Sequence, residues 1–277
     1  MARSVDVRLA VACCLALAAT AAGASDGLRI TGTGTALGAM RRVAAAYGKA
    51  SPGGSVQVLP SLGSSGAVKA VADGAIDLAL TGRPLKPDER SRAIVALPYA
   101  RTPFVLAAGP RVGVTGLGTE ELVRIYRGDL ATWPNGERVR LVLRPRSDID
   151  TALLAGLSPA MASAVDAAFA REGMLVAATN QDCHEILVRT PGSVGPSTLT
   201  QIATEDPSLR ALAWNGVEPT LENLAAGRYP LEKTLHAVVR RPPSAAVRRF
   251  LEFLGSREAR AILQEAGNLP VPLPAPD

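Results

Sequence analysis

Residues 59–85 read LPSLGSSGAVKAVADGAIDLALTGRPL, and this stretch decides the fold. A short apolar segment leads into a Gly/Ser corner that opens a helix, and a second apolar strand then ends at Thr81-Gly82-Arg83. A helix start presents backbone N–H groups without intrahelical partners and the positive end of the helix dipole. Because Ser64 and Ser65 add hydroxyls and Gly66 lets the backbone approach closely, we expect a small anion at this corner.

The same alternation of strands and helices extends along the rest of the chain. Apolar residues spaced as on one helix face follow the first strand, and Thr119 and Ser158 are typical helix caps. We expect strands at 28–30, 56–59, 76–80, 139–143 and 235–239, and extended segments at 97–108 and 269–276. We expect helices to follow residues 31–35, 63–66, 119 and 158, to resume at 152, and to cover 244–266. This spacing predicts an α/β fold with a parallel sheet and right-handed crossovers.

Three of the expected strands end in polar corners that open helices. These corners are residues 32–37, 63–66 and 144–151. Ligands of open α/β sheets bind at the carboxyl ends of the strands. Two such halves facing across a cleft form a clamshell. We expect one lobe to comprise residues 25–110 and about 206–277 and the other about 111–205, with 97–108 crossing between them.

The first 24 residues read as an export signal. Arg3 and Arg8 precede an apolar run at 9–22, and small residues lead to a cleavage site at Ala24. The two cysteines in that run lack a lipid-attachment context, so a lipoprotein is the lesser expectation. We expect export to the periplasm or cell envelope, and no later segment reaches membrane-spanning length.

Composition narrows the classes of ligand. The formal charge of +5 is mildly basic, which argues against nucleic acid as a partner. Aromatic residues make up 4% of the chain, too few to favour sugars or quaternary amines. Cys183 is the one cysteine beyond the expected leader, so no internal disulfide is expected in the mature chain.

The charge pattern favours an anion near the first two corners. Residues 27–72 contain no Asp or Glu but hold five cations, at Arg29, Arg41, Arg42, Lys49 and Lys69. A locally positive field attracts an anion. The alternative is a basic surface patch that binds no ligand.

The sequence gives little support for dinucleotide binding, for nucleophilic catalysis or for a metal site. The glycines at 32, 34 and 38 miss the dinucleotide fingerprint by one position, and the acidic residue that should follow is absent. Neither Ser64 nor Ser65 lies in a G-x-S-x-G motif. Residues 182–185, Asp-Cys-His-Glu, lack the spaced second pair of a structural zinc site and are expected to form a loop or helix start. We expect no catalytic residue, cofactor or metal.

Arg144 and Arg146 flank a proline just after the strand at 139–143. Guanidinium groups bind carboxylate, phosphate or sulfate through paired hydrogen bonds, so the two arginines are candidates to clamp an anion. The alternative is that they pair with Asp148 and Asp150.

Taken together, these motifs resemble the phosphate-type substrate-binding proteins of ABC transporters, which have the type II periplasmic-binding-protein fold. The order and spacing of several blocks carry the resemblance: TGTGT at 31–35, GSSG at 63–66, IDLALTGRPL at 76–85, GLGTEELVRIYRG at 116–128, RTPGSVG at 189–195, PTLENLAAGRYPL at 219–231 and FLEFLGS at 250–256.

The resemblance implies two α/β lobes that close on a small oxyanion, above all phosphate, without catalysis. It also implies a monomer that presents its closed form to an ABC permease in the membrane. The ligand-binding residues that follow by position are Thr33, Thr35, Ala36, Ser64, Ser65, Gly66, Thr81, Gly82, Arg83, Arg144, Arg146, Asp148, Asp150 and Thr151.

The chain departs from this family at two of those places. Some phosphate binders have an Asp, which accepts the proton of hydrogen phosphate, where this chain has Gly82. A Ser-Gly-Thr loop of the second lobe is replaced by residues 148–151, Asp-Ile-Asp-Thr. Either Asp148 or Asp150 replaces the missing acceptor, or the cage is altered and the ligand is not phosphate. An envelope sensor or scaffold on the same fold is the alternative function.

Overall fold

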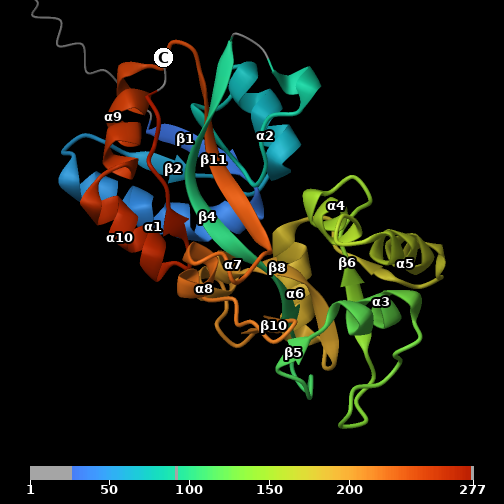
Figure 1. Cartoon of the computed structure of the whole chain (residues 1–277). Helices are drawn as coiled ribbons and strands as arrows, with labels where there is room; N and C mark the ends of the chain where they lie inside the picture. The colour runs from blue at the N-terminus through green and yellow to red at the C-terminus, as the bar shows by residue number, and fades with distance from the viewer. Residues whose placement is uncertain (1–26, 91–92, 276–277) are drawn as a thin grey trace, which may run out of the picture.

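The computed structural model describes residues 27–90 and 93–275, which form an α/β protein around one ten-stranded mixed sheet (Figure 1). The strand order along the main path is β2-β1-β3-β11-β4-β8-β6-β7. The expected export signal and its two cysteines lie outside the described residues. Within the described ranges, no helix is long and apolar enough to cross a membrane.

The first half of the sheet follows the prediction from the sequence. Strands β1 (Leu28–Gly32), β2 (Val56–Val58) and β3 (Leu78–Thr81) pair in parallel. Helix α1 (Gly34–Ala50) and helix α2 (Gly63–Ala72) connect them. Helix α1 begins two residues after the end of β1 and α2 five residues after the end of β2, which brings their N-termini to the same edge of the sheet.

Two long antiparallel strands cross the middle of the molecule, so the sheet is mixed and not parallel throughout as expected. Strand β11 (Glu232–Arg240) pairs antiparallel with β3 and with β4 (Ile94–Ala108). The later part of β4 pairs instead with β8 (Ser193–Thr198). Strand β4, the segment expected to be extended, therefore joins the two halves of the sheet (Figure 1).

The second half of the sheet holds β6 (Arg140–Leu143), which is parallel to both β7 (Leu175–Val176) and β8. The helices around it are α3 (Thr119–Arg127), α4 (Ile149–Ala155), α5 (Pro159–Ala170) and α6 (Asn180–Arg189). Two predicted starts were wrong: Gly118 is the N-cap of α3, and α4 begins at Ile149 and not near 152 because Asp148 caps it.

The C-terminal helical region at 244–266 is two helices and not one. Helix α9 (Ala245–Leu254) ends before Gly255, and α10 (Arg257–Glu265) begins anew because the Ser256 hydroxyl accepts a hydrogen bond from the Ala259 amide. The remaining elements are short: β5 (Gly116–Leu117), η1 (Pro87–Glu89), α7 (Leu199–Thr204), β9 (Arg210–Ala211), β10 (Ala213–Trp214), α8 (Leu221–Ala225) and β12 (Leu269–Pro270).

Buried side chains form two large clusters. One gathers residues between 28 and 100 with residues from 235 to 266, and the other gathers residues from 104 to 229. The expected lobes place 104–108 and 209–229 in the first lobe, whereas their buried side chains pack in the second cluster. The lobe boundaries stay a prediction, and these clusters favour crossings near 100–104 and 229–235.

Candidate functional site

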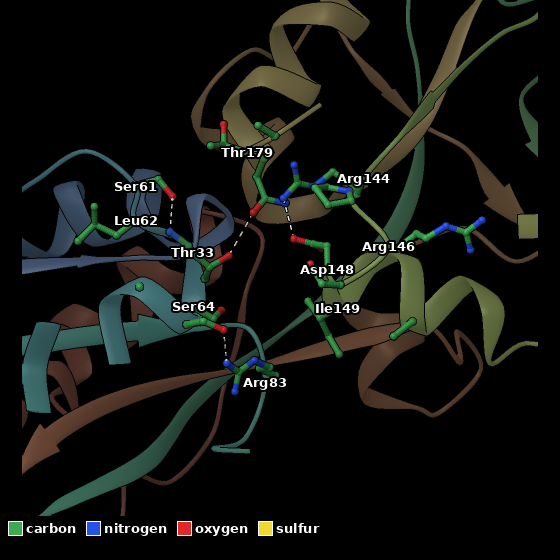
Figure 2. Close-up of a pocket in the computed structure, with 18 of the residues that line it drawn as sticks. Thr33, Ser61, Leu62, Ser64, Arg83, Arg144, Arg146, Asp148, Ile149 and Thr179 are labelled. Atoms are coloured by element: carbon green, nitrogen blue, oxygen red, sulfur yellow. Dashed lines mark hydrogen bonds and ion pairs between the residues drawn. The ribbon is translucent and has the colours of Figure 1, made fainter. Parts of the chain in front are cut away.

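A cavity of about 500 Å³ lies between elements of the two clusters (Figure 2). Its lining residues are Thr33, Ser61, Leu62, Gly63, Ser64, Ser65, Gly66, Arg83, Lys86, Arg144, Pro145, Arg146, Ser147, Asp148, Ile149, Ala152, Ala178, Thr179 and Asn180. We refer to this cavity as the central pocket.

Four helix N-termini meet at the central pocket. The N-cap residues of α1, α2, α4 and α6 are Thr33, Leu62, Asp148 and Thr179, and all four line it. The caps of α4 and α6 accept backbone hydrogen bonds, whereas α1 and α2 have no side-chain cap and no acidic residue in the first turn. The starts of α1 and α2 therefore offer the positive ends of two helix dipoles to a ligand.

Ser64 and Ser65 are set up to donate hydrogen bonds. The Ser64 hydroxyl accepts from the Gly82 amide at 3.3 Å, and the Ser65 hydroxyl accepts from Arg83 Nη2 at 2.9 Å. A hydroxyl carries one hydrogen, and accepting a bond leaves that hydrogen available. Both groups can therefore donate to an anion in the central pocket.

Arg83 lines the central pocket but is held by a carboxylate. Its Nη1 and Nη2 atoms lie 2.7 and 2.6 Å from the two oxygens of Glu89. The hydrogen bonds from Arg83 lower the pKa of the Glu89 carboxyl below its ordinary value, so the pair is ionised at neutral pH. Arg83 therefore contributes a compensated charge and orients the Ser65 hydroxyl.

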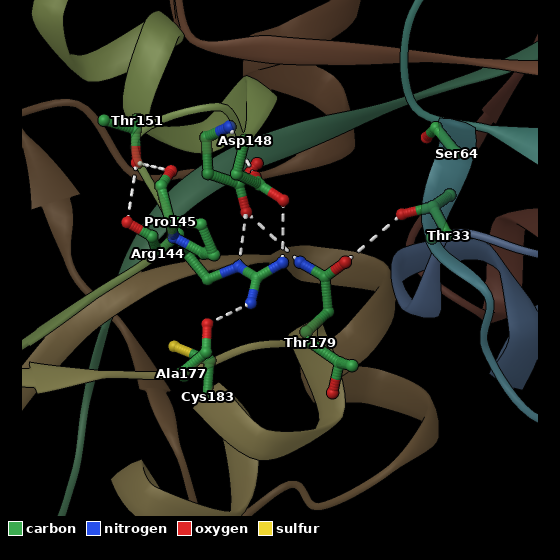
Figure 3. A network of polar contacts seen from close by, with 12 residues as sticks. Thr33, Ser64, Arg144, Pro145, Asp148, Thr151, Ala177, Thr179 and Cys183 are labelled. Atoms are coloured by element: carbon green, nitrogen blue, oxygen red, sulfur yellow. Dashed lines mark hydrogen bonds and ion pairs between the residues drawn. The ribbon is translucent and has the colours of Figure 1, made fainter. Parts of the chain in front are cut away.

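Arg144 directly follows the last residue of β6, and its guanidinium is held by a network of polar contacts (Figure 3). Its Nη1 donates to the Ala177 carbonyl, and its Nη2 lies 2.7 Å from Asp148 Oδ2. The Thr151 hydroxyl donates to the carbonyls of Arg144 and Pro145, at 3.0 and 2.9 Å, which fixes the loop between β6 and α4. The guanidinium is buried, and Asp148 compensates its charge.

A buried ion pair lies behind Arg144. The Asp150 carboxylate contacts Lys233 Nζ, and its Oδ2 lies 3.9 Å from Arg144 Nε and accepts from the Asn180 amide at 3.2 Å. The Thr33 hydroxyl in turn donates to the Asn180 side-chain oxygen at 3.2 Å. Asn180 thus links the start of α1 to the charge network of α4.

Eight of the fourteen predicted ligand-binding residues line the central pocket: Thr33, Ser64, Ser65, Gly66, Arg83, Arg144, Arg146 and Asp148. Six do not: Thr35, Ala36, Thr81, Gly82, Asp150 and Thr151. Thr35 and Ala36 are fully buried within α1, and the Thr81 hydroxyl is turned back to the Arg83 carbonyl. Of the two candidate acceptors, Asp148 faces the pocket, whereas Asp150 is enclosed with Lys233.

Arg146 turns away from the other lining residues (Figure 2). Its Nη1 lies 2.5 Å from Asp166, and its guanidinium carbon lies 4.3 Å from the centroid of the Phe169 ring. The alternative of pairing with Asp148 and Asp150 therefore holds for Arg144, which pairs with Asp148, but not for Arg146, because an acid on α5 takes that place. Lys86 is the one lining cation without an ion pair to a described residue.

Sequence reasoning missed the contribution of α6. Thr179 and Asp182 cap that helix reciprocally, a signal that could have located its start and placed Asn180 in the pocket. The expectation of a helix start at 182–185 is confirmed, since these residues lie in the first turns of α6. Cys183 is buried there, and burial raises the pKa of its thiol to about 12.

The fold and the pocket define a class of ligand-binding α/β proteins. A family model described as the PBP superfamily domain matches residues 17–258, and the chain belongs to this superfamily. The sequence is similar to the phosphate-binding protein PstS of Bacillus subtilis (strain 168), with 25% identity over 255 residues, 90% of this chain and 82% of that protein. The family resemblance drawn from the sequence is confirmed.

Solved structures agree on the fold. A candidate phosphate ABC transporter substrate-binding protein from Clostridium perfringens, with bound phosphate, matches with a TM-score of 0.75 and 18% identity over 89% of this chain and all of that one. An ABC-type phosphate transport receptor from Vibrio cholerae matches with a TM-score of 0.62 and 22% identity over 87% of this chain and 99% of that one. The predicted periplasmic-binding-protein architecture is confirmed.

Proposed function

We propose that the chain is an exported solute-binding protein that captures a small oxyanion, most of all phosphate, for an ABC importer. The observation that carries this proposal is the meeting of the starts of α1 and α2, whose N-cap residues make no side-chain cap bond, with two donating hydroxyls in one pocket. The similarity to phosphate-binding proteins supports phosphate as the anion. Capture needs no bond to be made or broken.

On the side of the first cluster, the ligand oxygens meet backbone amides at the start of α2 and the hydroxyls of Ser64 and Ser65. The low dielectric of a partly enclosed pocket strengthens these hydrogen bonds. On the other side, Arg144 supplies positive charge from the end of β6. The anion thus bridges groups on two separately packed halves, which favours the form in which those halves are close together.

Asp148 gives the pocket a way to distinguish protonated anions. A carboxylate repels an anion unless the anion carries a proton that the carboxylate can accept. Hydrogen phosphate has such a proton at neutral pH and sulfate has none. Asp148 therefore takes the acceptor role that Gly82 cannot fill, and its Oδ2 lies 2.7 Å from Arg144 Nη2.

The proposal also covers where the protein works and how it delivers its ligand. The leader at 1–24 directs export, and the ligand-bound monomer presents its closed surface to a membrane permease. Isothermal titration of ligand-stripped protein with phosphate, sulfate and molybdate tests the proposal. We expect one site that prefers phosphate, and absence of heat with all three anions would overturn it.

A sensor or scaffold on the same fold is the second candidate function. The observation that favours it is that Arg83 and Arg144 are already paired with Glu89 and Asp148, which reduces their attraction for an added anion. In that case the titration shows no phosphate binding, and the protein is recovered from cell envelopes with a partner other than a permease.

A further inference from the structure

The central pocket is larger than an inorganic oxyanion needs. Its volume is about 500 Å³, within the range of about 300–1,000 Å³ that is usual for sites binding organic molecules. Phosphate has five non-hydrogen atoms, and one water molecule occupies about 30 Å³ of liquid volume. A phosphate held at the start of α2 therefore leaves most of the pocket to water or to another part of the ligand.

Part of the pocket wall is apolar. Leu62, at the N-cap of α2, is 55% exposed although it is a large aliphatic residue, and it lines the pocket beside Ser64. Ile149, the first residue of α4, lies across the pocket from Ser64 and Arg83 (Figure 2). Ala152 and Ala178 continue the apolar surface. Apolar side chains thus come from the starts of α2 and α4 and from the residue before the N-cap of α6.

The ion pairs of the pocket also favour a ligand with an apolar part. Arg83, Arg144 and Arg146 are each paired with a carboxylate, so they add less to the binding of a bare dianion than unpaired arginines would. Binding then depends on Lys86, the helix-start donors, the hydroxyls and the other contacts of the ligand. Leu62 and Ile149 can supply affinity only to a ligand with an apolar part.

We infer that the preferred ligand is a phosphate or phosphonate group that carries a small organic substituent. The anionic group binds at the start of α2, and the substituent lies between Leu62 and Ile149. This inference rests on the proposed function and narrows its ligand class. Inorganic phosphate uses the same donors but leaves the apolar contacts unused.

The test is a titration series of inorganic phosphate, methylphosphonate and propylphosphonate with the ligand-stripped protein. Each buried methylene is expected to tighten binding about fourfold, so propylphosphonate should bind about 15-fold more tightly than methylphosphonate. Leu62→Ser and Ile149→Ser should each reduce that ratio. Leu175→Ser is the matched control, because Leu175 is an exposed leucine of β7 outside the pocket, and it should keep the full ratio.

The outcomes separate this inference from the proposed function. Phosphate binding without a gain along the phosphonate series overturns the inference and leaves the proposed function standing. Absence of binding by all three compounds overturns both. If Ile149→Ser fails to fold, as judged by circular dichroism, the exposed position Leu62 and the wild-type series carry the test.

Discussion

Lys233 of β11 and Asp150 of α4 form an ion pair with both side chains almost completely buried, 1% and 0% exposed, directly behind Arg144. Lys233 lies on a strand that crosses the middle of the sheet, and Asp150 lies on the first turn of a helix that borders the central pocket. The pair therefore connects β11, in the middle of the sheet, to the helix that borders the central pocket.

Removal of one member of this pair should be costly. Lys233→Met leaves the buried Asp150 charge with only the 3.9 Å contact to Arg144 Nε and the hydrogen bond from Asn180, which is expected to lower the free energy of unfolding by about 3–5 kcal/mol. The Lys233→Met/Asp150→Asn double variant should regain much of that loss, because it removes the charge left behind. Urea unfolding measures both, and equal instability of the single and double variants would contradict the account.

Position 82 offers a direct test of anion selection. A Cβ at Gly82 would meet its nearest atoms, Lys233 Cδ and Thr33 Cγ2, at 3.8 Å, an ordinary contact. Gly82→Asp therefore fits and adds a proton acceptor close to the pocket. We expect the ratio of phosphate to sulfate affinity to rise about tenfold, because dihydrogen phosphate has a second proton for a second carboxylate beside Asp148, whereas sulfate has none. Gly82→Asn is the neutral control, and an equal rise with Asn would rule out the carboxylate as the cause.

The contribution of Glu89 to the stability of the fold should be lost as the pH falls. Hydrogen bonds from Arg83 lower the pKa of Glu89 in the folded state below 4.5, so the unfolded chain takes up the proton first as the pH falls. The stabilisation is present above pH 4.5 and is lost as the pH falls through the folded-state pKa. Glu89→Gln should cost about 1.5–3 kcal/mol at pH 7, and the difference from wild type should shrink below pH 4. A difference that stays constant from pH 7 to 3 would contradict this.

Cys183 should be unreactive in the native protein. Burial raises the pKa of its thiol to about 12, and its sulfur donates weakly to the Pro196 carbonyl. At pH 8 we expect no labelling by a thiol reagent under native conditions and stoichiometric labelling in urea. Rapid labelling of the folded mature chain would show that α6 opens locally.

The sequence predicted the parts of the fold that depend on local pattern. The corner at 63–66 opens α2 and the strand at 76–80 is close to β3, because glycine, serine and apolar runs act within a few residues. The pairing of β11 with β3 and β4 joins residues at least 129 positions apart, the separation of Glu232 and Pro103, and no local pattern encodes it. That is why the antiparallel centre of the sheet was not foreseen.

The same difference between local pattern and long-range contact explains which residues of the site the sequence could predict. Ser64, Ser65 and Arg144 were found because they follow strand ends directly. Lys233 was missed because its partner Asp150 lies 83 positions earlier in the chain, and Asp150 was misplaced for the same reason. The acid that takes Arg146 is Asp166 on α5, which only the packing of α5 beside α4 brings within reach.

The central claim is that an anion binds in the central pocket against Arg144, and the phosphate affinity of two arginine variants tests it most directly. Arg144→Ala removes a cation of the pocket and leaves Asp148 unpaired, and both effects should weaken binding, together by at least about tenfold. Arg111→Ala removes an exposed arginine outside the pocket and should change the affinity less than about twofold. Equal effects of the two substitutions would show that the ligand binds elsewhere.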